Sequence, residues 1–175
     1  MKKILMLFLS FALVLVMMVV SVLPSSSTSS NGSVDTDISD NYDGYEPDGD
    51  STVGNNIVKS ALTKIGCKYV WGAEGPNEFD CSGLVWWSMN ENGVKFTRTT
   101  AAVLSTMGQE VKTDDLQPGD IITFRTIPSY VSHVGIYIGD GKMVHAPNPE
   151  TPVKVEPVLS SKYWMSVMVN CRRLY

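Results

Sequence analysis

Cysteine and histidine are scarce in this chain of 175 residues, which contains three cysteines and two histidines. The odd number of cysteines excludes a framework in which every thiol is paired within one molecule. Cys67 and Cys171 either form a disulfide or are two small buried side chains, and both alternatives stay open. No cysteine or histidine pair has the short spacing of zinc ligands, and no nucleotide, flavin or haem motif occurs. We therefore expect neither a metal nor a cofactor.

A surplus of basic residues is also missing. The chain has 14 lysines and arginines against 18 aspartates and glutamates, a formal net charge of −4. Seven of the acidic residues lie in residues 25–52, so residues 53–175 hold 12 basic and 11 acidic residues. Because no basic stripe stands out, we do not expect nucleic acid as a partner.

The N-terminus carries the longest apolar run. Lys2 and Lys3 precede residues 4–23, which are apolar except for Ser10 and Ser21. This order predicts an export segment over residues 1–24, either a cleaved signal peptide or a retained membrane anchor. Because the lysines stay in the cytoplasm, we expect the rest of the chain on the extracellular, cell-wall side, with residues 4–23 as its one contact with the membrane.

Residues 25–52 differ in composition from both neighbouring segments. They are rich in Ser, Asp, Gly and Asn, lack Lys and Arg, and contain almost no aliphatic residues. Such a segment cannot bury enough apolar surface to offset the entropy of ordering it, which predicts a disordered acidic linker. Residues 53–175 have the composition of one globular domain, which we expect to be a monomer.

Hydrophobic periodicity predicts helices at the start of this domain and strands at its end. Apolar side chains recur every three or four residues over 57–65, and further helices are expected over 81–92 and 100–107. Strands are expected over 120–125, 133–138, 143–146, 153–155 and 166–172. Helices followed by strands predict an α+β fold, with the helices packed on one side of an antiparallel sheet.

Cys81 is a candidate nucleophile. Asp80 stands in the capping position of the helix predicted over 81–92, which puts Cys81 at the helix N-terminus. The positive end of the helix and its free N–H groups favour the reactive thiolate and are placed to stabilise an oxyanion. A cysteine at a helix start is often only a packing residue, so this position alone does not establish a nucleophile.

The two histidines supply the other parts of a thiol-dependent site. A nucleophilic thiol needs a neighbouring base, and the base needs a polar group that orients it. His133 and His145 flank one predicted hairpin, whose turn is Asp140-Gly141. A plain two-residue turn would place the histidines on opposite faces of the sheet, whereas a β-bulge would bring them to the same face.

Six motifs together resemble the NlpC family of papain-like cell-wall endopeptidases. They are YVWG at 69–72, FDCSGLV at 79–85, RT at 98–99, LQPGD at 116–120, HVGIYIG at 133–139 and HAP at 145–147. They follow the family's order and spacing and cover nearly all of residues 57–175. The chain departs from the family at Val103, where Gln is frequent, and at Ala73, where a second Gly is frequent.

The resemblance implies a circularly permuted papain-like fold and a Cys81–His133–His145 triad in which His145 orients His133. It also implies that Tyr69 lies beside the nucleophile, and that Asp80 and Ser82 help bind the amino end of the substrate. The implied substrate is the peptidoglycan stem peptide. It is cut between the γ-carboxyl of D-glutamate and the diamino acid, which is either meso-diaminopimelate or lysine.

Two other functions are alternatives to hydrolysis on the same fold. A non-catalytic wall-binding module would have no use for Cys81 and His133, and both are present. A thiol-dependent acyl or amide transferase would form the same thioester and pass the acyl group to an amine in place of water.

Overall fold

The computed structural model describes residues 51–175, and the export segment predicted over residues 1–24 lies outside them. The linker predicted over residues 25–52 also lies outside them, except for its last two residues. Ser51 caps helix α1, which begins at Thr52, one residue before the expected start of the domain. Within residues 51–175, no helix is both long and apolar enough to cross a membrane.

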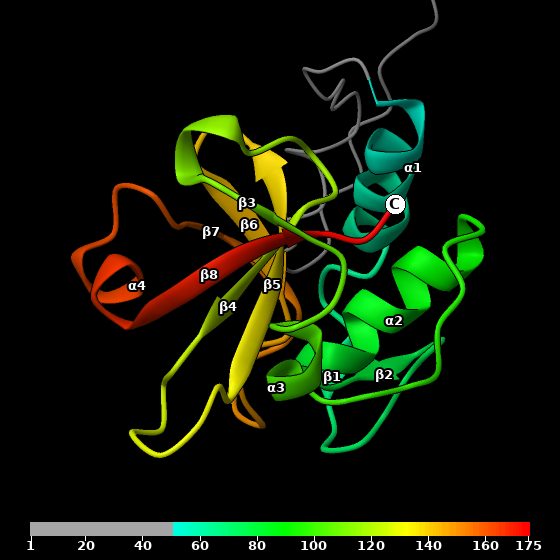
Figure 1. The fold of residues 1–175 in the computed structure, drawn as a ribbon. Coiled ribbons are helices and arrows are strands. Elements are labelled where there is room, and N and C mark those ends of the chain that lie inside the picture. Colours follow the sequence, from blue (N-terminus) through cyan, green and yellow to red (C-terminus); the bar gives the residue numbers. More distant parts are fainter. Residues whose placement is uncertain (1–50) are drawn as a thin grey trace, which may run out of the picture. The chain divides into compact units, whose positions relative to one another are not determined.

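Helices and an antiparallel sheet make up the described residues, which confirms the predicted α+β class (Figure 1). The elements in chain order are α1 (Thr52–Leu62), β1 (Lys68–Tyr69), β2 (Glu78–Phe79), α2 (Cys81–Glu91), α3 (Ala101–Leu104), β3 (Gln109–Val111), the 3-10 helix η1 (Thr113–Asp115), β4 (Ile121–Phe124), β5 (His133–Gly139), β6 (Lys142–His145), β7 (Lys154–Pro157), α4 (Lys162–Val167) and β8 (Met168–Arg173).

The main sheet has six strands in the order β3-β8-β4-β5-β6-β7, and every neighbouring pair is antiparallel. Strands β1 and β2 form a separate parallel pair just before α2. Figure 1 shows α1 and α2 on one side of the main sheet and α4 on the other. Helices α1 and α2 therefore pack on one side of the sheet, as expected. Helix α4 is an additional helix that was not predicted, and its last two residues belong to the strand predicted over 166–172.

One hydrophobic cluster joins the helices to the sheet. It contains Ile57 of α1, Leu84 of α2, and Val134 and Ile136 of β5, all fully buried. Each such side chain contributes about 1.5–3 kcal/mol on leaving water. This packing holds the N-terminal end of α2 against β5, the strand that begins with His133.

A second cluster covers the opposite face of the sheet. Phe124, Tyr137 and Met143 are buried there, with Trp164 of α4 packed against them. Cys171 belongs to this cluster, whereas Cys67 packs against the first one. The two thiols therefore lie on different sides of the sheet, and Cys67, Cys81 and Cys171 are all free. The disulfide alternative was wrong, and the alternative of two packed thiols describes the structure.

A β-bulge in the β5–β6 hairpin sets which face carries the histidines. Gly139 pairs with Lys142 across the two-residue turn, but Ile136 pairs with Val144, so the register shifts by one residue between them. The shift turns His133 and His145 to the same face, as expected if a bulge is present. On that face Gly135 has no room for a Cβ atom, which would lie 2.7 Å from the sulfur of Met143.

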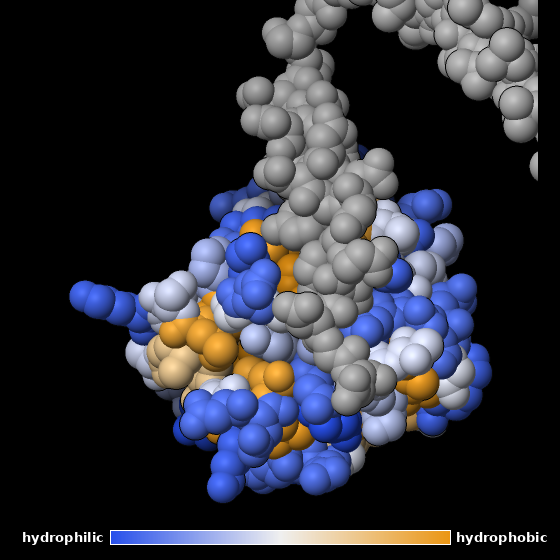
Figure 2. All heavy atoms as spheres, turned by 90° about the horizontal axis from the view of Figure 1, so that it is seen from above, coloured by the Kyte–Doolittle hydropathy of each residue, from blue (hydrophilic) through white to orange (hydrophobic). Residues whose placement is uncertain are grey.

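The exposed surface offers few broad apolar areas on the face that Figure 2 presents. Residues 51–175 are mostly hydrophilic in that view, with small separate apolar patches between charged side chains. The largest exposed apolar side chain is Trp71, which is 82% exposed. It belongs to the loop between β1 and β2, beside the cavities described below.

Candidate active site

Cys81 is the first residue of α2 and lies where two cavities meet. The Asp80 side chain caps the helix by accepting a hydrogen bond from the Gly83 N–H over 2.6 Å. Cys81 is 8% exposed, and the backbone N–H groups of Ser82 and Val134 donate to its sulfur. The predicted position at a helix N-terminus is therefore correct, and the sulfur lies against the start of β5.

The cavities on the two sides of Cys81 differ in chemistry. One has a volume of about 550 Å³ and includes Ser82 and Arg98 in its lining. The other has a volume of about 500 Å³ and includes His133 and Lys154. Both volumes are in the range of small-ligand sites. Because Cys81 lines both cavities, a bound substrate can extend in two directions from the sulfur.

His133 and His145 form a buried pair on the face of the sheet opposite α1 and α2. His133 Nε2 lies 2.9 Å from His145 Nδ1, and the side chains are 5% and 0% exposed. Trp164 holds both rings: it stacks on His133 at 5.4 Å between ring centroids and meets His145 edge-on at 5.3 Å. The structure thus brings together both predicted histidines, with His133 in the same cavity lining as Cys81.

Glu156 of β7 continues this arrangement beyond His145. Its Oε2 lies 3.1 Å from His145 Nε2, although the imidazole N–H is not well aligned with that oxygen. The same oxygen accepts a hydrogen bond from Trp164 Nε1 over 3.1 Å, and Lys154 Nζ lies 2.5 Å from Oε1. Sequence reasoning did not find Glu156, Lys154 or Trp164, because no local motif marks a side chain that acts across strands.

Burial controls the protonation of the thiol and its neighbouring base. Burial, with a contribution from the charge of Asp80, raises the pKa of Cys81 to about 11. The N–H groups of Val134 and Ser82 lower this pKa, but their effect is smaller. Burial, with a contribution from His145, lowers the pKa of His133 to about 3. The N–H group of Ser82 at the helix N-terminus thus favours the thiolate, as expected, but burial has the larger effect on the pKa. At neutral pH the pair consists of a thiol and an imidazole base.

We predict that alkylation of Cys81 keeps accelerating as the pH rises from 6 to 9. Only the thiolate reacts, so below the raised pKa the rate increases about tenfold per pH unit. Mass spectrometry of the Cys81 peptide after timed exposure to iodoacetamide measures this rate, with circular dichroism to verify folding at each pH. A rate that is already constant below pH 7 would instead indicate a preformed thiolate–imidazolium pair.

Tyr69 ends β1 and lines both cavities beside Cys81. Burial, with contributions from Cys81 and Asp80, raises the pKa of its phenol to about 12. The hydroxyl group therefore keeps its proton at neutral pH and is able to donate a hydrogen bond to a developing oxyanion. This placement matches the expectation that Tyr69 lies beside the nucleophile.

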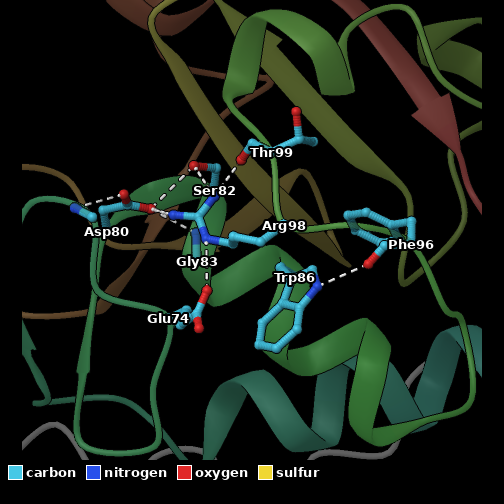
Figure 3. A network of polar contacts seen from close by, with 9 residues as sticks. Glu74, Asp80, Ser82, Gly83, Trp86, Phe96, Arg98 and Thr99 are labelled. Carbon is cyan, nitrogen blue, oxygen red and sulfur yellow. Dashed lines mark hydrogen bonds and ion pairs between the residues drawn. The ribbon is translucent and has the colours of Figure 1, made fainter.

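Asp80 and Ser82 belong to a polar network centred on Arg98 (Figure 3). Arg98 Nη2 donates to Asp80 Oδ1 over 2.6 Å, and Arg98 Nη1 donates to Ser82 Oγ over 2.9 Å. Asp80 Oδ2 also accepts from the Gly72 N–H over 2.9 Å. Glu74 lies 3.6 Å from Arg98 Nε. Arg98 belongs to one of the motifs that carry the family resemblance. Its contact with Asp80 could not be predicted from the sequence, because the two residues are 18 positions apart.

Close backbone packing explains the glycine after the Cys81-Ser82 pair. A Cβ atom on Gly83 would lie 2.0 Å from the carbonyl oxygen of Ala73. This contact involves the backbone carbonyl of residue 73. It is therefore the same with Ala73 as it would be with the glycine that is frequent at this position in the family. The other departure, Val103, is 47% exposed and does not contribute to the lining of either cavity.

Cysteine and histidine side chains also bind metal ions in proteins. Across residues 51–175, no group of three or more His, Cys, Asp or Glu side chains is arranged to hold a metal ion.

Comparison with known proteins gives the relatives of this chain. It is 46% identical over 116 residues to a probable endopeptidase of Mycobacterium bovis, covering 66% of this chain and 29% of that protein. It is 35% identical over 119 residues to a gamma-DL-glutamyl hydrolase of Bacillus subtilis, covering 67% and 28%. The chain thus spans less than a third of the length of either relative.

A solved structure and a family pattern agree with these sequences. The NlpC/p60 domain of the peptidoglycan hydrolase SagA matches with a TM-score of 0.58 and 29% identity, over 69% of this chain and 97% of that domain. This likeness confirms the expected papain-like fold. The pattern of the NlpC/P60 family matches residues 66–173, a segment that contains Cys81, both histidines and the Arg98 network. The chain therefore belongs to the NlpC/P60 family.

Proposed function

We propose that the chain is a cysteine endopeptidase that hydrolyses peptidoglycan stem peptides between the γ-carboxyl of D-glutamate and the diamino acid. The observation that carries this proposal is the arrangement around Cys81. The sulfur, at the start of α2, shares a cavity with His133, and His133 Nε2 lies 2.9 Å from His145 Nδ1. A thiol, a base and a group that orients the base are the parts of a nucleophilic triad.

The reaction follows from the protonation states. As Cys81 attacks the amide carbon, its proton passes to the free nitrogen of His133, and the carbonyl oxygen becomes an oxyanion. His133 then gives the proton to the leaving amine, which departs and leaves a thioester on Cys81. Water, deprotonated by His133, attacks the thioester, and the acyl product leaves with a carboxylate while the thiol is restored.

The cavity beside Arg98 is suited to the acyl part of this substrate. In L-alanyl-γ-D-glutamate the α-carboxylate of glutamate is free, and the amino end of alanine is positively charged. Arg98 provides a cation and Asp80 an anion, held 2.6 Å apart. Opposite charges at fixed positions match a ligand that carries both signs and discriminate against an α-linked glutamate.

The cavity beside His133 is suited to the leaving group. His133 must protonate the departing amine, so the diamino acid lies on this side of Cys81. Lys154, 33% exposed at its side chain, lies in the lining there, together with Glu156. Two names among the similar proteins support the proposal: a gamma-DL-glutamyl hydrolase supports the type of bond, and a peptidoglycan hydrolase supports the substrate.

We also propose that the domain acts on the outer side of the bacterial membrane. This part of the proposal is supported by the apolar residues 4–23 after Lys2 and Lys3, and these residues lie outside the described part of the chain. A domain that faces the wall would have access to stem peptides without any carrier.

Synthetic peptides test the proposed reaction directly. The full-length protein is incubated with L-alanyl-γ-D-glutamyl peptides that end in meso-diaminopimelate or lysine, and with the α-linked isomer of each. We expect mass spectrometry to detect L-alanyl-D-glutamate and the free diamino acid from a γ-linked peptide only. N-acetylation of alanine is expected to lower kcat/KM by about tenfold or more, because it removes the charge that Asp80 would attract.

Other products would point to other functions. Equal cleavage of the α-linked isomer would contradict the proposed specificity. Products with the acyl group joined to an added amine would identify a transferase. Binding of the peptides without any covalent change would identify a binding module.

A further inference from the structure

Two neutral imidazoles that face each other have one N–H each, and their arrangement decides whether His133 is a base. If His133 Nε2 carries the proton toward His145 Nδ1, then the other nitrogen of His133 is free to accept a proton from Cys81. If His145 Nδ1 carries the proton toward His133, then His133 Nε2 accepts it and the nitrogen that serves Cys81 is already protonated. The 2.9 Å contact between the rings is compatible with either arrangement.

Glu156 distinguishes between them. An ionised carboxylate only accepts hydrogen bonds, so the nitrogen that faces it must carry a proton. His145 Nε2 faces Glu156 Oε2 at 3.1 Å. The single N–H of His145 is therefore on Nε2, its Nδ1 is an acceptor, and His133 must donate from Nε2. This is the arrangement that leaves His133 competent as a base.

We propose that Glu156 is a positioning residue that selects the Nε2–H form of both His145 and His133, and so keeps His133 ready to accept the proton of Cys81. This role deepens the proposed function and rests on it. No proton passes to Glu156 in this scheme. When His133 becomes an imidazolium, the carboxylate stabilises its charge through the neutral ring of His145.

Two contacts besides that with His145 hold the Glu156 carboxylate in place. Trp164 Nε1 donates to Oε2 over 3.1 Å, and Lys154 Nζ lies 2.5 Å from Oε1. These partners come from different elements, α4 and β7, and the carboxylate is only 29% exposed. The contact with His145 and the nearby Lys154 ammonium lower the pKa of Glu156 to about 2. Glu156 is therefore ionised at every pH at which His133 is neutral and available as a base.

Strand register explains why Glu156 reaches His145. In the β6–β7 pair, His145 is opposite Lys154 and Met143 is opposite Glu156. Side chains on one face alternate along a strand, so all four lie on the same face, and Glu156 is the diagonal neighbour of His145. The bulge in β5 puts His133 on that face as well.

Nuclear magnetic resonance of the imidazole nitrogens tests this inference without any substrate. The chain has two histidines, so each ring is assigned by comparing the spectrum with that of a single-histidine variant. At pH 7 we expect both rings of the unmodified full-length protein in the Nε2–H form. In Glu156→Ala we expect His145 to become a mixture of the two forms, with His133 partly protonated on the nitrogen that serves Cys81.

Two substitutions of Glu156 distinguish the effect of its hydrogen-bonding oxygen from the effect of its charge. Glu156→Gln retains a carbonyl oxygen that Trp164 and His145 can share, so we expect the Nε2–H form to persist while kcat falls about tenfold. Glu156→Ala is expected to lower kcat about 100-fold with little change in KM, within the usual range for general acid–base effects. Glu150→Gln is the matched control on the exposed loop before β7, and we expect no change in the spectrum or the rate.

The outcomes distinguish this inference from the proposed function. A His145 ring protonated on Nδ1 in the unmodified protein would overturn it, and so would an unchanged spectrum in Glu156→Ala. Either result leaves peptide cleavage by Cys81 intact. If the protein cleaved no peptide while the spectra behaved as expected, the positioning role would stand and the proposed reaction would fail.

Discussion

Replacement of Cys81 with alanine is expected to abolish cleavage of the γ-linked stem peptide, lowering kcat by a factor on the order of 10⁶. Without the sulfur there is no thioester, and neither His133 nor Tyr69 is placed to substitute for it as a nucleophile. The fold should be retained, because Cys81 contributes one small side chain to a large cluster. Release of L-alanyl-D-glutamate, followed by mass spectrometry, measures the loss.

The chain contains its own matched control. Cys67→Ala removes a free thiol that lies in the loop after α1, outside the linings of both cavities at Cys81. We expect this variant to retain the activity of the unmodified protein. Cleavage that survives Cys81→Ala, or that is lost equally in Cys67→Ala, would exclude Cys81 as the nucleophile.

Replacement of Asp120 with alanine is expected to lower the free energy of unfolding by about 3–5 kcal/mol, the usual cost of breaking a buried ion pair. Asp120 is fully buried and receives two hydrogen bonds from Arg173, each 2.7 Å long. It also accepts from the Gln117 N–H over 2.8 Å. Removing the carboxylate leaves a partly buried guanidinium and a backbone N–H without these acceptors.

This ion pair also holds the end of the chain against the start of the domain. Arg173 ends β8, and the hydroxyl of Tyr175 donates to the carbonyl of Pro118 over 2.8 Å, close to Gly54 of α1. Loss of Asp120 is therefore expected to loosen α1 together with the last strand, while Cys81 stays in place below the melting temperature.

Chemical denaturation measures this effect. Asp114→Ala is a matched control, because Asp114 is an exposed aspartate in η1 and its removal is expected to cost less than about 0.5 kcal/mol. Asp120→Asn should be intermediate, since the amide keeps one acceptor for Arg173. Equal stabilities of the Asp120→Ala and Asp114→Ala variants would contradict the importance assigned to the buried pair.

Local patterns in the sequence were sufficient for most elements of the fold. Apolar spacing predicted α1, because a helix that buries one side shows it in its own residues. Asp80 and the residues after it predicted where α2 begins, and thus that Cys81 stands at a helix N-terminus. Helix α4 was not predicted, and its last two residues were assigned to the strand over 166–172. Its single helical turn and a half is too short to leave a periodic pattern, and its capping residue, Ser161, gave no sufficient signal.

Local sequence patterns could not predict the interactions between strands. Alternation shows that a strand has two faces, but not which face meets the next strand, so one bulge between Tyr137 and Gly139 decided whether His133 and His145 could meet. The contacts of Glu156 with His145 and of Arg98 with Asp80 join segments that no local motif connects.

The sequence by itself determined the α+β class, the resemblance to a family and the identity of Cys81, His133 and His145, because these depend on residue type and on neighbours along the chain. Tertiary structure alone decided the pairing of the histidines, the carboxylate behind them and the protonation of the thiol. Burial outweighed the effect expected from the helix N-terminus on the pKa of Cys81. Burial and register are properties of packed elements, and a charge or proton responds to everything packed around it rather than to its position in the sequence.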